Sequence, residues 1–294
     1  MSDPSISIIA VSYFGAADAR LLVDSLLPQD FDDWQLVIVD NSVDPTEREL
    51  LQELASDDAR IRILFSGKNL GYFGAAHHAF DVVSPLGDVV VMNTDVVFGG
   101  PTVLGQLRRE SLSRDDLGVL APAIISERSG RDQNPHLVAM PSVRVAAMRR
   151  WATATPLLTQ LSLLLSDVRR RKRPLPGTQP GEVSLIYAAH GSFMYLTEKY
   201  FASSGDLRHP LFLFGEEIYV AEHARRAGLE TWHLPMVTMN HVEHGTMGIR
   251  RSRAVLQMSG KATRYALHTA KAAAQERRSD SPQPQNGRTS GSQG

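Results

Sequence analysis

Short runs of apolar residues alternate with segments of helical periodicity in the first part of the chain. Runs rich in β-branched residues predict strands, and leucines and alanines that recur at spacings of three and four predict helices. The predicted strands are 6–11, 35–39, 61–65, 88–92 and 118–122, and the predicted helices are 17–27, 45–54 and 75–83. Strands that are apolar along their whole length and alternate with helices are typical of a mostly parallel sheet covered on both faces.

One of these helices has a clear start signal. Asp44 can cap it and Pro45 suits its first position, while Leu50, Leu51 and Leu54 are expected to form its buried face. Later in the chain we expect a strand at 183–189, a helix at 216–227 ended by Gly228, and two short strands at 231–234 and 237–240. A C-terminal helix is expected at 254–275, and from Arg278 onward the chain has no apolar residue, which is typical of a disordered tail.

The segment 144–173 differs from its surroundings. It contains eight Arg or Lys residues and one acidic residue, Asp167, around the mostly apolar run 156–165. One interpretation is a helix that lies on a membrane surface, with its charges facing anionic lipid headgroups. The other is a helical insertion that packs on the core and has a solvated basic rim. The sequence leaves both interpretations open.

Composition narrows the class of protein. A net charge of −1 gives no overall basic field to favour nucleic-acid binding. The absence of cysteine excludes disulfides and thiol nucleophiles and fits a reducing compartment. There is no visible secretory signal and no apolar run near the ~20 residues that a membrane span needs. We therefore expect a cytoplasmic protein, with peripheral contact at the inner face of the membrane as the open alternative.

Acidic residues mark the candidate chemistry. Asp95 follows the predicted strand 88–92, Glu216 and Glu217 open a predicted helix, and His241 follows the last predicted strand. Open α/β sheets bind ligands beyond the carboxyl ends of their strands. A carboxylate there, joined by a carboxylate pair and a histidine, can supply a divalent-metal site and an acid/base group. This pattern indicates an enzyme that acts on a phosphorylated, metal-chelated substrate.

Several segments together resemble family 2 of the glycosyltransferases. They lie in the family's order at 7–11, 37–42, 69–74, 92–95 and 213–217, followed by His241, and they look most similar to the bacterial rhamnosyltransferase-like and galactofuranosyltransferase-like branch. The resemblance implies a GT-A fold, in which a Rossmann-like, mostly parallel sheet has helices on both faces. It also implies a nucleotide-diphosphate sugar donor, Mg²⁺ or Mn²⁺ as cofactor, and inversion at the anomeric carbon.

The resemblance also implies roles for individual residues. Glu217 would be the catalytic base, assisted by Glu216, and Asp95 and His241 would hold the metal. Gly191, Ser192 and Glu216 would contact the acceptor, and the donor would be bound by Ser12, Asp40, Asn69, Gly71, Asn93 and Asp95. The chain would then divide into a nucleotide-sugar-binding half at 1–125, a variable basic and apolar insertion at 126–182, an acceptor and catalytic half at 183–277, and the tail at 278–294.

The expected reaction moves a sugar, such as rhamnose or a related sugar, from a dTDP- or UDP-sugar to a saccharide, lipid-linked or small-molecule acceptor in cell wall or polysaccharide biosynthesis. Two positions depart from the family pattern: Asn93 replaces the first acid of an Asp-X-Asp motif, and Tyr219 replaces an acid common in the branch. Purely structural roles also stay open, namely a turn at Asp40, a buried hydrogen-bonded His241, and first-turn glutamates at 216 and 217. A non-catalytic nucleotide-sugar or carbohydrate-binding relative and a nucleotidyltransferase are the alternative functions.

Overall fold

The computed structural model describes residues 5–56, 58–170, 181–203, 205–243 and 252–279. Its strands are β1 (Ile6–Ser12), β2 (Trp34–Asp40), β3 (Ile61–Phe65), β4 (Asp88–Asn93), β5 (Val96–Phe98), β6 (Leu117–Ser126), β7 (Ser184–Ile186), β8 (Phe193–Leu196) and β9 (Glu230–His241). Its helices are α1 (Ala16–Leu26), α2 (Pro45–Leu54), α3 (Tyr72–Val83), α4 (Val103–Leu112), α5 (Val143–Ala152), α6 (Pro156–Arg170), α7 (Glu198–Ala202), α8 (Glu216–Arg226) and α9 (Arg253–Ser279).

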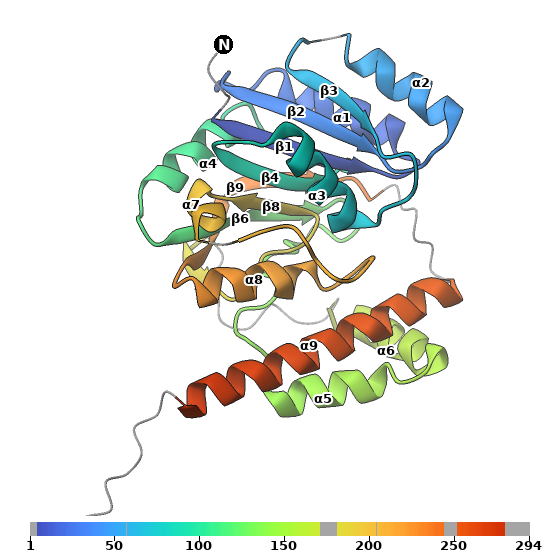
Figure 1. Cartoon of the computed structure of the whole chain (residues 1–294), viewed down its shortest axis with the longest axis vertical. Helices are drawn as coiled ribbons and strands as arrows, with labels where there is room; N and C mark the ends of the chain where they lie inside the picture. The colour runs from blue at the N-terminus through green and yellow to red at the C-terminus, as the bar shows by residue number, and fades with distance from the viewer. Residues whose placement is uncertain (1–4, 57, 171–180, 204, 244–251, 280–294) are drawn as a thin grey trace, which may run out of the picture.

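All strands of the described residues belong to one sheet (Figure 1). Its order is β3-β2-β1-β4-β8-β6-β9-β5, and β7 also pairs with β9. The strands β1 to β4, β6 and β9 run in one direction, because β8 is antiparallel to both β4 and β6 and β6 is parallel to β9. Only β5, β7 and β8 run the other way among these strands. The predicted mixed α/β fold with a mostly parallel sheet is therefore confirmed.

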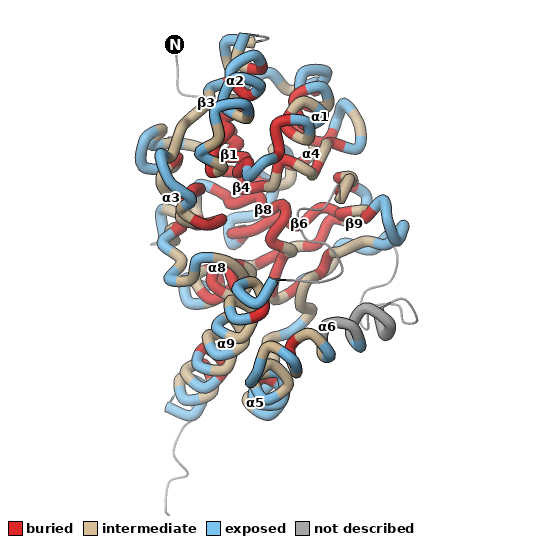
Figure 2. Tube along the Cα trace, turned by 90° about the vertical axis from the view of Figure 1, so that its right-hand side faces the viewer, coloured by how far each residue is buried: buried red, intermediate tan, exposed pale blue. Residues whose placement is uncertain are grey.

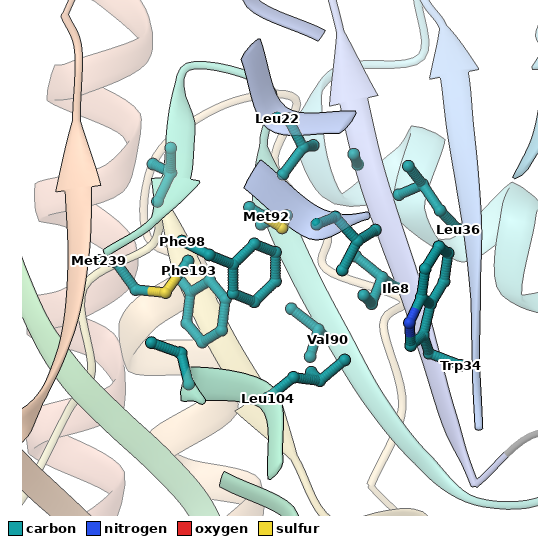
Figure 3. Packing of buried hydrophobic residues seen from close by; sticks show 14 of the residues in the cluster. Ile8, Leu22, Trp34, Leu36, Val90, Met92, Phe98, Leu104, Phe193 and Met239 are labelled. Atoms are coloured by element: carbon teal, nitrogen blue, oxygen red, sulfur yellow. The ribbon is translucent and has the colours of Figure 1, made fainter. Parts of the chain in front are cut away.

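The sheet is buried on both faces, because alternate residues of each strand point to opposite sides. In β1, Ile8 packs with α1 and α4 in one apolar cluster, whereas Ile9 packs with α3 and α8 in a second cluster. Figure 2 shows the central strands as the most buried part of the molecule. Figure 3 shows the first cluster, in which Phe98 and Phe193 meet edge to face, with ring centroids 6.5 Å apart. Two buried faces explain why the strands are apolar throughout.

The helices α5, α6 and α9 form a separate layer beside α8, which we call the helical layer (Figure 1). The hydroxyls of Thr153 and Thr263 lie 2.5 Å apart and tie the end of α5 to α9. Glu276 of α9 accepts Arg225 of α8 at 2.6 Å and Arg226 at 3.2 Å, so the layer is attached to α8 by ion pairs. In the part of the chain that the structure describes, no helix has the length and apolarity needed to cross a bilayer.

Some local predictions need correction. Leu51 and Leu54 are buried as predicted, but Leu50 is exposed, because only one side of α2 faces the sheet. The expected strand at 183–189 is limited to β7, and the two expected strands near the end are one strand, β9, with a bulge opposite Pro122 and Ala123. The sequence analysis did not predict β5, β8, α4, α5 or α7. Helix α9 continues to Ser279, so Arg278 is helical, and the rest of the predicted tail lies outside the described residues.

Asp88 is a buried hub at the start of β4. Its Oδ2 accepts Arg108 Nη1 at 2.7 Å and the Ser111 and Tyr195 hydroxyls at 2.6 Å each, and its Oδ1 accepts the Glu198 N–H at 2.8 Å. Asp88→Ala should lower the free energy of unfolding by about 3–5 kcal/mol, because it leaves the partly buried Arg108 and several buried donors unpaired.

Urea unfolding monitored by circular dichroism measures this loss. The control is Asp24→Ala, which removes an exposed carboxylate 3.9 Å from Arg20 and should cost less than about 1 kcal/mol. Equal losses in the two variants would show that Asp88 is not a structural hub.

Candidate active site

The carboxyl ends of β1, β2 and β4 bring three predicted donor residues to one edge of the sheet. Ser12 pairs with Asp40, and Val11 pairs with Asn93 on the other side of β1. Ser12 is buried and its hydroxyl oxygen has no hydrogen-bond partner among the described residues. Asp40 is also buried, and its Oδ1 accepts the Ser42 N–H at 2.9 Å and the Ser42 hydroxyl at 2.5 Å. Asp40 thus has the turn role that the sequence left open, while its Oδ2 accepts no hydrogen bond from the described residues.

Asn41, which the sequence analysis did not single out, fixes the second predicted donor turn. Its amide donates to Asn69 Oδ1 at 3.0 Å and to the Gly71 carbonyl at 3.1 Å, and its Oδ1 accepts the Leu70 N–H at 2.8 Å. Gly71 has a φ of +76°, and a Cβ there would lie 2.1 Å from the Phe212 carbonyl oxygen. The missing side chain of Gly71 therefore admits the loop that precedes α8, which couples this turn to the glutamate pair.

Asp95 and His241 meet where β5 pairs with β9. Asp95 Oδ2 lies 3.2 Å from His241 Nε2, and Asp95 Oδ1 is buried without a partner in the described residues. Behind the imidazole, His241 Nδ1 lies 2.7 Å from Gln133 Oε1, and Gln133 Nε2 donates to Glu243 Oε1 at 3.0 Å. Since the Glu243 carboxylate only accepts, Gln133 must present its oxygen to Nδ1, which therefore carries the proton.

These hydrogen bonds orient His241 in a way that suits the binding of a divalent cation. With the proton on Nδ1, a neutral His241 directs the lone pair of Nε2 toward the Asp95 carboxylate, and two acceptors at that distance repel unless a cation or proton lies between them. A hydrogen bond behind a metal-binding histidine is the usual way to fix its tautomer. No cluster of three or more acidic or histidine ligands occurs in the described ranges. The site therefore offers two ligands and leaves the other positions to substrate oxygens and water.

Glu216 and Glu217 form the first turn of α8 after Gly215, whose φ is +94°. An added Cβ on Gly191 would lie 3.1 Å from Glu216 Oε1 and 3.0 Å from Glu217 Oε1, so both side chains turn toward Gly191. Ser192 is buried next to it, where its hydroxyl lies 2.9 Å from His190 Nδ1. The predicted acceptor residues and the glutamate pair are thus brought together.

The two glutamates have opposite shifts in pKa. Burial, and then the charge of Glu217, raise the pKa of Glu216 well above its usual range. Burial alone would also raise the pKa of Glu217, but the nearby imidazoles of His136 and His190, together with backbone hydrogen bonds, outweigh it and lower that pKa. His136 Nδ1 lies 3.7 Å from Glu217 Oε1. As the pH rises, Glu217 therefore loses its proton first, and Glu216 holds the last proton of the pair.

Tyr72 is close enough to the Asp95–His241 pair and to the glutamates to respond to the charges of both. Its hydroxyl donates to the Gly191 carbonyl at 2.7 Å. Burial raises the pKa of Tyr72 well above its usual value, and the charges of Glu216, Glu217 and Asp95 raise it further. One neutral, buried hydroxyl is thus within electrostatic reach of all three carboxylates, which indicates a single site.

Tyr219, the second departure from the family pattern, has a packing role. Its side chain is buried, its hydroxyl donates to Asp206 Oδ1, and its ring lies 5.1 Å from His209 and 4.3 Å from His223. The sequence reasoning also missed Gln133, His136 and His190 as site residues. His190 directly precedes the predicted Gly191, whereas no signal in the sequence marked the loop that carries Gln133 and His136.

Comparison with known proteins identifies relatives of this arrangement. The family model described as "Glycosyl transferase family 2" matches residues 7–153, which is half of the chain. A search of curated proteins finds no match. Among solved structures, the mannosyltransferase PcManGT from Pyrobaculum calidifontis, in complex with GDP-Man and Mn²⁺, superposes with a TM-score of 0.52 at 13% identity, covering 97% of this chain and 78% of that one.

Two longer proteins share the same fold. GalNAc-T7 with UDP, GalNAc and Mn²⁺ superposes with a TM-score of 0.58 at 12% identity, over 82% of this chain and 44% of that one. TarS from S. aureus superposes with a TM-score of 0.55 at 12% identity, over 81% of this chain and 36% of that one. This chain spans less than half the length of either protein. At these identities the likeness shows a common fold, the GT-A fold.

The protonation of the glutamate pair can be tested directly. Infrared spectra at pH 7 should show the C=O band of a protonated carboxylic acid that is absent in Glu216→Gln. In Glu217→Gln the band should disappear at a lower pH than in the unmodified protein, because the charge that helps to raise the pKa of Glu216 is gone.

Glu222→Gln is the control, since Glu222 is buried but paired with Arg225 at 2.9 Å, and it should leave the band unchanged. A band that persists in Glu216→Gln would assign the proton to another group.

Proposed function

Because the chain belongs to glycosyl transferase family 2, we propose that it transfers a sugar from a nucleoside-diphosphate donor to an acceptor hydroxyl, with inversion at the anomeric carbon. The observation that carries this proposal is the geometry of the site, in which Glu216 and Glu217 both turn toward Gly191 and Asp95 faces His241. The opposite pKa shifts of the two glutamates support it. An ionised carboxylate and a cation-binding pair on one site are the two groups that such a transfer requires.

The donor is proposed to bind at the edge formed by β1, β2 and β4. Asp40 Oδ2 is the acceptor for the imide N–H of uracil or thymine, which favours a UDP- or dTDP-sugar, and Ser12 and the turn of Asn69 and Gly71 border the nucleotide. The Pyrobaculum structure holds GDP-Man and that of GalNAc-T7 holds UDP, so the relatives differ in their base. Asp40 is therefore the residue that supports a pyrimidine here. A rhamnose-type sugar remains our proposal for the transferred group, and it rests on the resemblance of the motifs.

Asp95 and His241 are proposed to hold Mg²⁺ or Mn²⁺. The solved structures of PcManGT and GalNAc-T7, which share this fold, contain Mn²⁺, and this supports a divalent cation here. When bound, the cation neutralises charge on the donor diphosphate and makes it a better leaving group. Asn93 supplies no charge, but its backbone N–H donates to the Ser192 carbonyl at 3.0 Å and joins the donor side to the acceptor side.

Glu217 is the proposed base. The acceptor oxygen attacks the anomeric carbon from the face opposite the diphosphate, its proton passes to Glu217, and the bond from the anomeric carbon to the diphosphate oxygen breaks. The lowered pKa of Glu217 keeps it ionised at neutral pH, and Glu216, which holds a proton, can donate a hydrogen bond to the acceptor. The acceptor is proposed to be a saccharide, a lipid-linked sugar or a small molecule that approaches past Gly191 and Ser192.

Donor binding tests the metal pair. Thermal unfolding with UDP- and dTDP-sugars and Mn²⁺ should show stabilisation of about 2.7 kcal/mol at about 100 times the dissociation constant. Asp95→Ala should lose the metal-dependent part. Gln133→Leu should weaken metal affinity about 10–100-fold, because it removes the hydrogen bond that orients His241.

The control is Asp81→Ala, which removes an exposed carboxylate of α3 and should bind donor normally. Metal-dependent stabilisation that survives in Asp95→Ala would remove this residue from the metal site.

Turnover tests the base. Glu217→Gln keeps the shape of the side chain but loses basicity, so donor affinity should persist while transfer falls about 10²–10⁴-fold. Release of the nucleoside diphosphate in the presence of a panel of acceptors is the assay. Glu216→Gln should lose less. Near-normal turnover in Glu217→Gln with an inactive Glu216→Gln would assign the base to Glu216, and donor binding without any turnover in the unmodified protein would favour a non-catalytic relative.

A further inference from the structure

The helical layer presents apolar side chains to solvent on its outer side. Trp151 of α5 is 71% exposed and Leu157 of α6 is 79% exposed, and Met148, Leu161 and Leu165 are at least half exposed. Single apolar side chains are often exposed in soluble proteins, but several that gather on one surface mark a contact site. The packing of α5 and α6 on α9 therefore accounts for only one side of these helices.

The exposed residues form stripes that lie opposite the buried sides. At 100° per residue, Leu157, Leu161 and Leu165 lie on one line along α6, roughly opposite the fully buried Thr159. In α5, Met148 and Trp151 share a face with the exposed Arg144, opposite the buried Ala146. Each helix thus has a packed side and an apolar outer side. The packed sides lie against α9, while the outer sides are the part of this segment to which the membrane-surface interpretation refers.

The helical layer also concentrates positive charge. Together α5, α6 and α9 contain eleven Arg and Lys residues but only two acidic residues, Asp167 and Glu276. The whole chain, by contrast, has 31 basic and 32 acidic residues. Exposed examples are Arg144 of α5 and Lys261, Arg264 and Lys271 of α9. The α/β domain is correspondingly acidic, so the charge of the protein is polarised toward this layer.

We propose that the outer side of the helical layer binds the surface of an anionic lipid bilayer. Trp151 and the leucines of α6 enter the boundary between headgroups and acyl chains, where tryptophan is enriched in membrane proteins, and the basic residues contact the headgroups. Charge decides between this occupant and a second copy of the chain, because two equally basic layers would repel each other whereas an anionic surface attracts them.

Docking there has a consequence for the active site. Glu276 of α9 pairs with Arg225 and Arg226 of α8, and Glu216 and Glu217 open the same helix α8. A membrane bound by the layer is thus linked through α8 to the acceptor side of the site. The inference does not depend on the proposed transfer reaction, since membrane binding is measured without donor or acceptor.

Vesicle flotation of the full chain tests the proposal. The protein should float with vesicles of phosphatidylcholine and phosphatidylglycerol, should not float with phosphatidylcholine alone, and should dissociate as salt is raised. Brominated lipids should quench Trp151 fluorescence and leave the buried Trp34 unaffected.

Variants at exposed positions identify the surface. The double variant Leu157→Glu with Leu161→Glu should weaken binding to anionic vesicles at least about tenfold, because it removes apolar side chains that enter the bilayer. The double variant Arg144→Glu with Arg264→Glu should weaken binding by at least as much, because each basic residue near such a surface contributes roughly a fivefold factor in affinity. The matched controls are Leu86→Glu with Leu112→Glu, which are 67% and 66% exposed outside the layer, and Arg62→Glu with Arg109→Glu. The control variants should bind like the unmodified protein.

Three results would overturn the proposal. They are no binding to anionic vesicles at low salt, equal losses in the layer variants and their controls, and a change of oligomeric state in the Leu157 and Leu161 variant without any vesicle binding. The last result, measured by light scattering, would identify the layer as an interface between copies of the chain. Thermal unfolding of every variant checks that the fold is intact.

Discussion

Three carboxylates around one buried tyrosine impose the main constraint on this structure. The charges of Asp95, Glu216 and Glu217 all raise the pKa of Tyr72. Bringing these negative charges together in the protein costs free energy unless each is compensated. The protein uses a different solution for each. Glu216 takes up a proton, Glu217 faces His136 and His190, and Asp95 faces His241. Imidazoles rather than guanidinium groups face Glu217 and Asp95, and a cation between Asp95 and a neutral His241 would complete the site.

The fold brings these groups together through a few close contacts. Strand β4 leads to Asp95, and its pairing with β8 places Gly191 and Ser192 beside the end of β4. The absence of side chains at Gly71 and Gly191 lets the loop before α8 and the glutamates approach. The positive end of the α8 dipole then favours an ionised carboxylate at Glu217. A family 2 glycosyltransferase with the GT-A fold thus has its proposed donor and acceptor groups on one edge of one sheet.

The sequence predicted best where one physical signal dominates. The strands β1, β2 and β4 are buried on both faces, and together with β3 they were found within about one residue. Asp44 caps α2 as expected, accepting the Thr46 and Glu47 N–H groups. The short strands β5 and β8 carry too few residues for a periodic signal, and Leu50 was misjudged because periodicity cannot say how wide the buried face of a helix is. Gln133 and His136 reach the site from a loop by contacts over about a hundred residues of sequence, which no local pattern encodes. The opposite pKa shifts of adjacent glutamates likewise depend on those distant histidines.

The most direct test of the central claim is a crystal structure with Mn²⁺ and a non-hydrolysable UDP- or dTDP-sugar, in which the metal is located by its anomalous scattering. We expect the Mn²⁺ peak between Asp95 and His241 with the diphosphate as its third partner, and the anomeric carbon on the side of Glu217. A metal more than about 6 Å from both residues, well beyond coordination distance, or a donor bound away from Asp40 and Glu217 would contradict the assignment of this site.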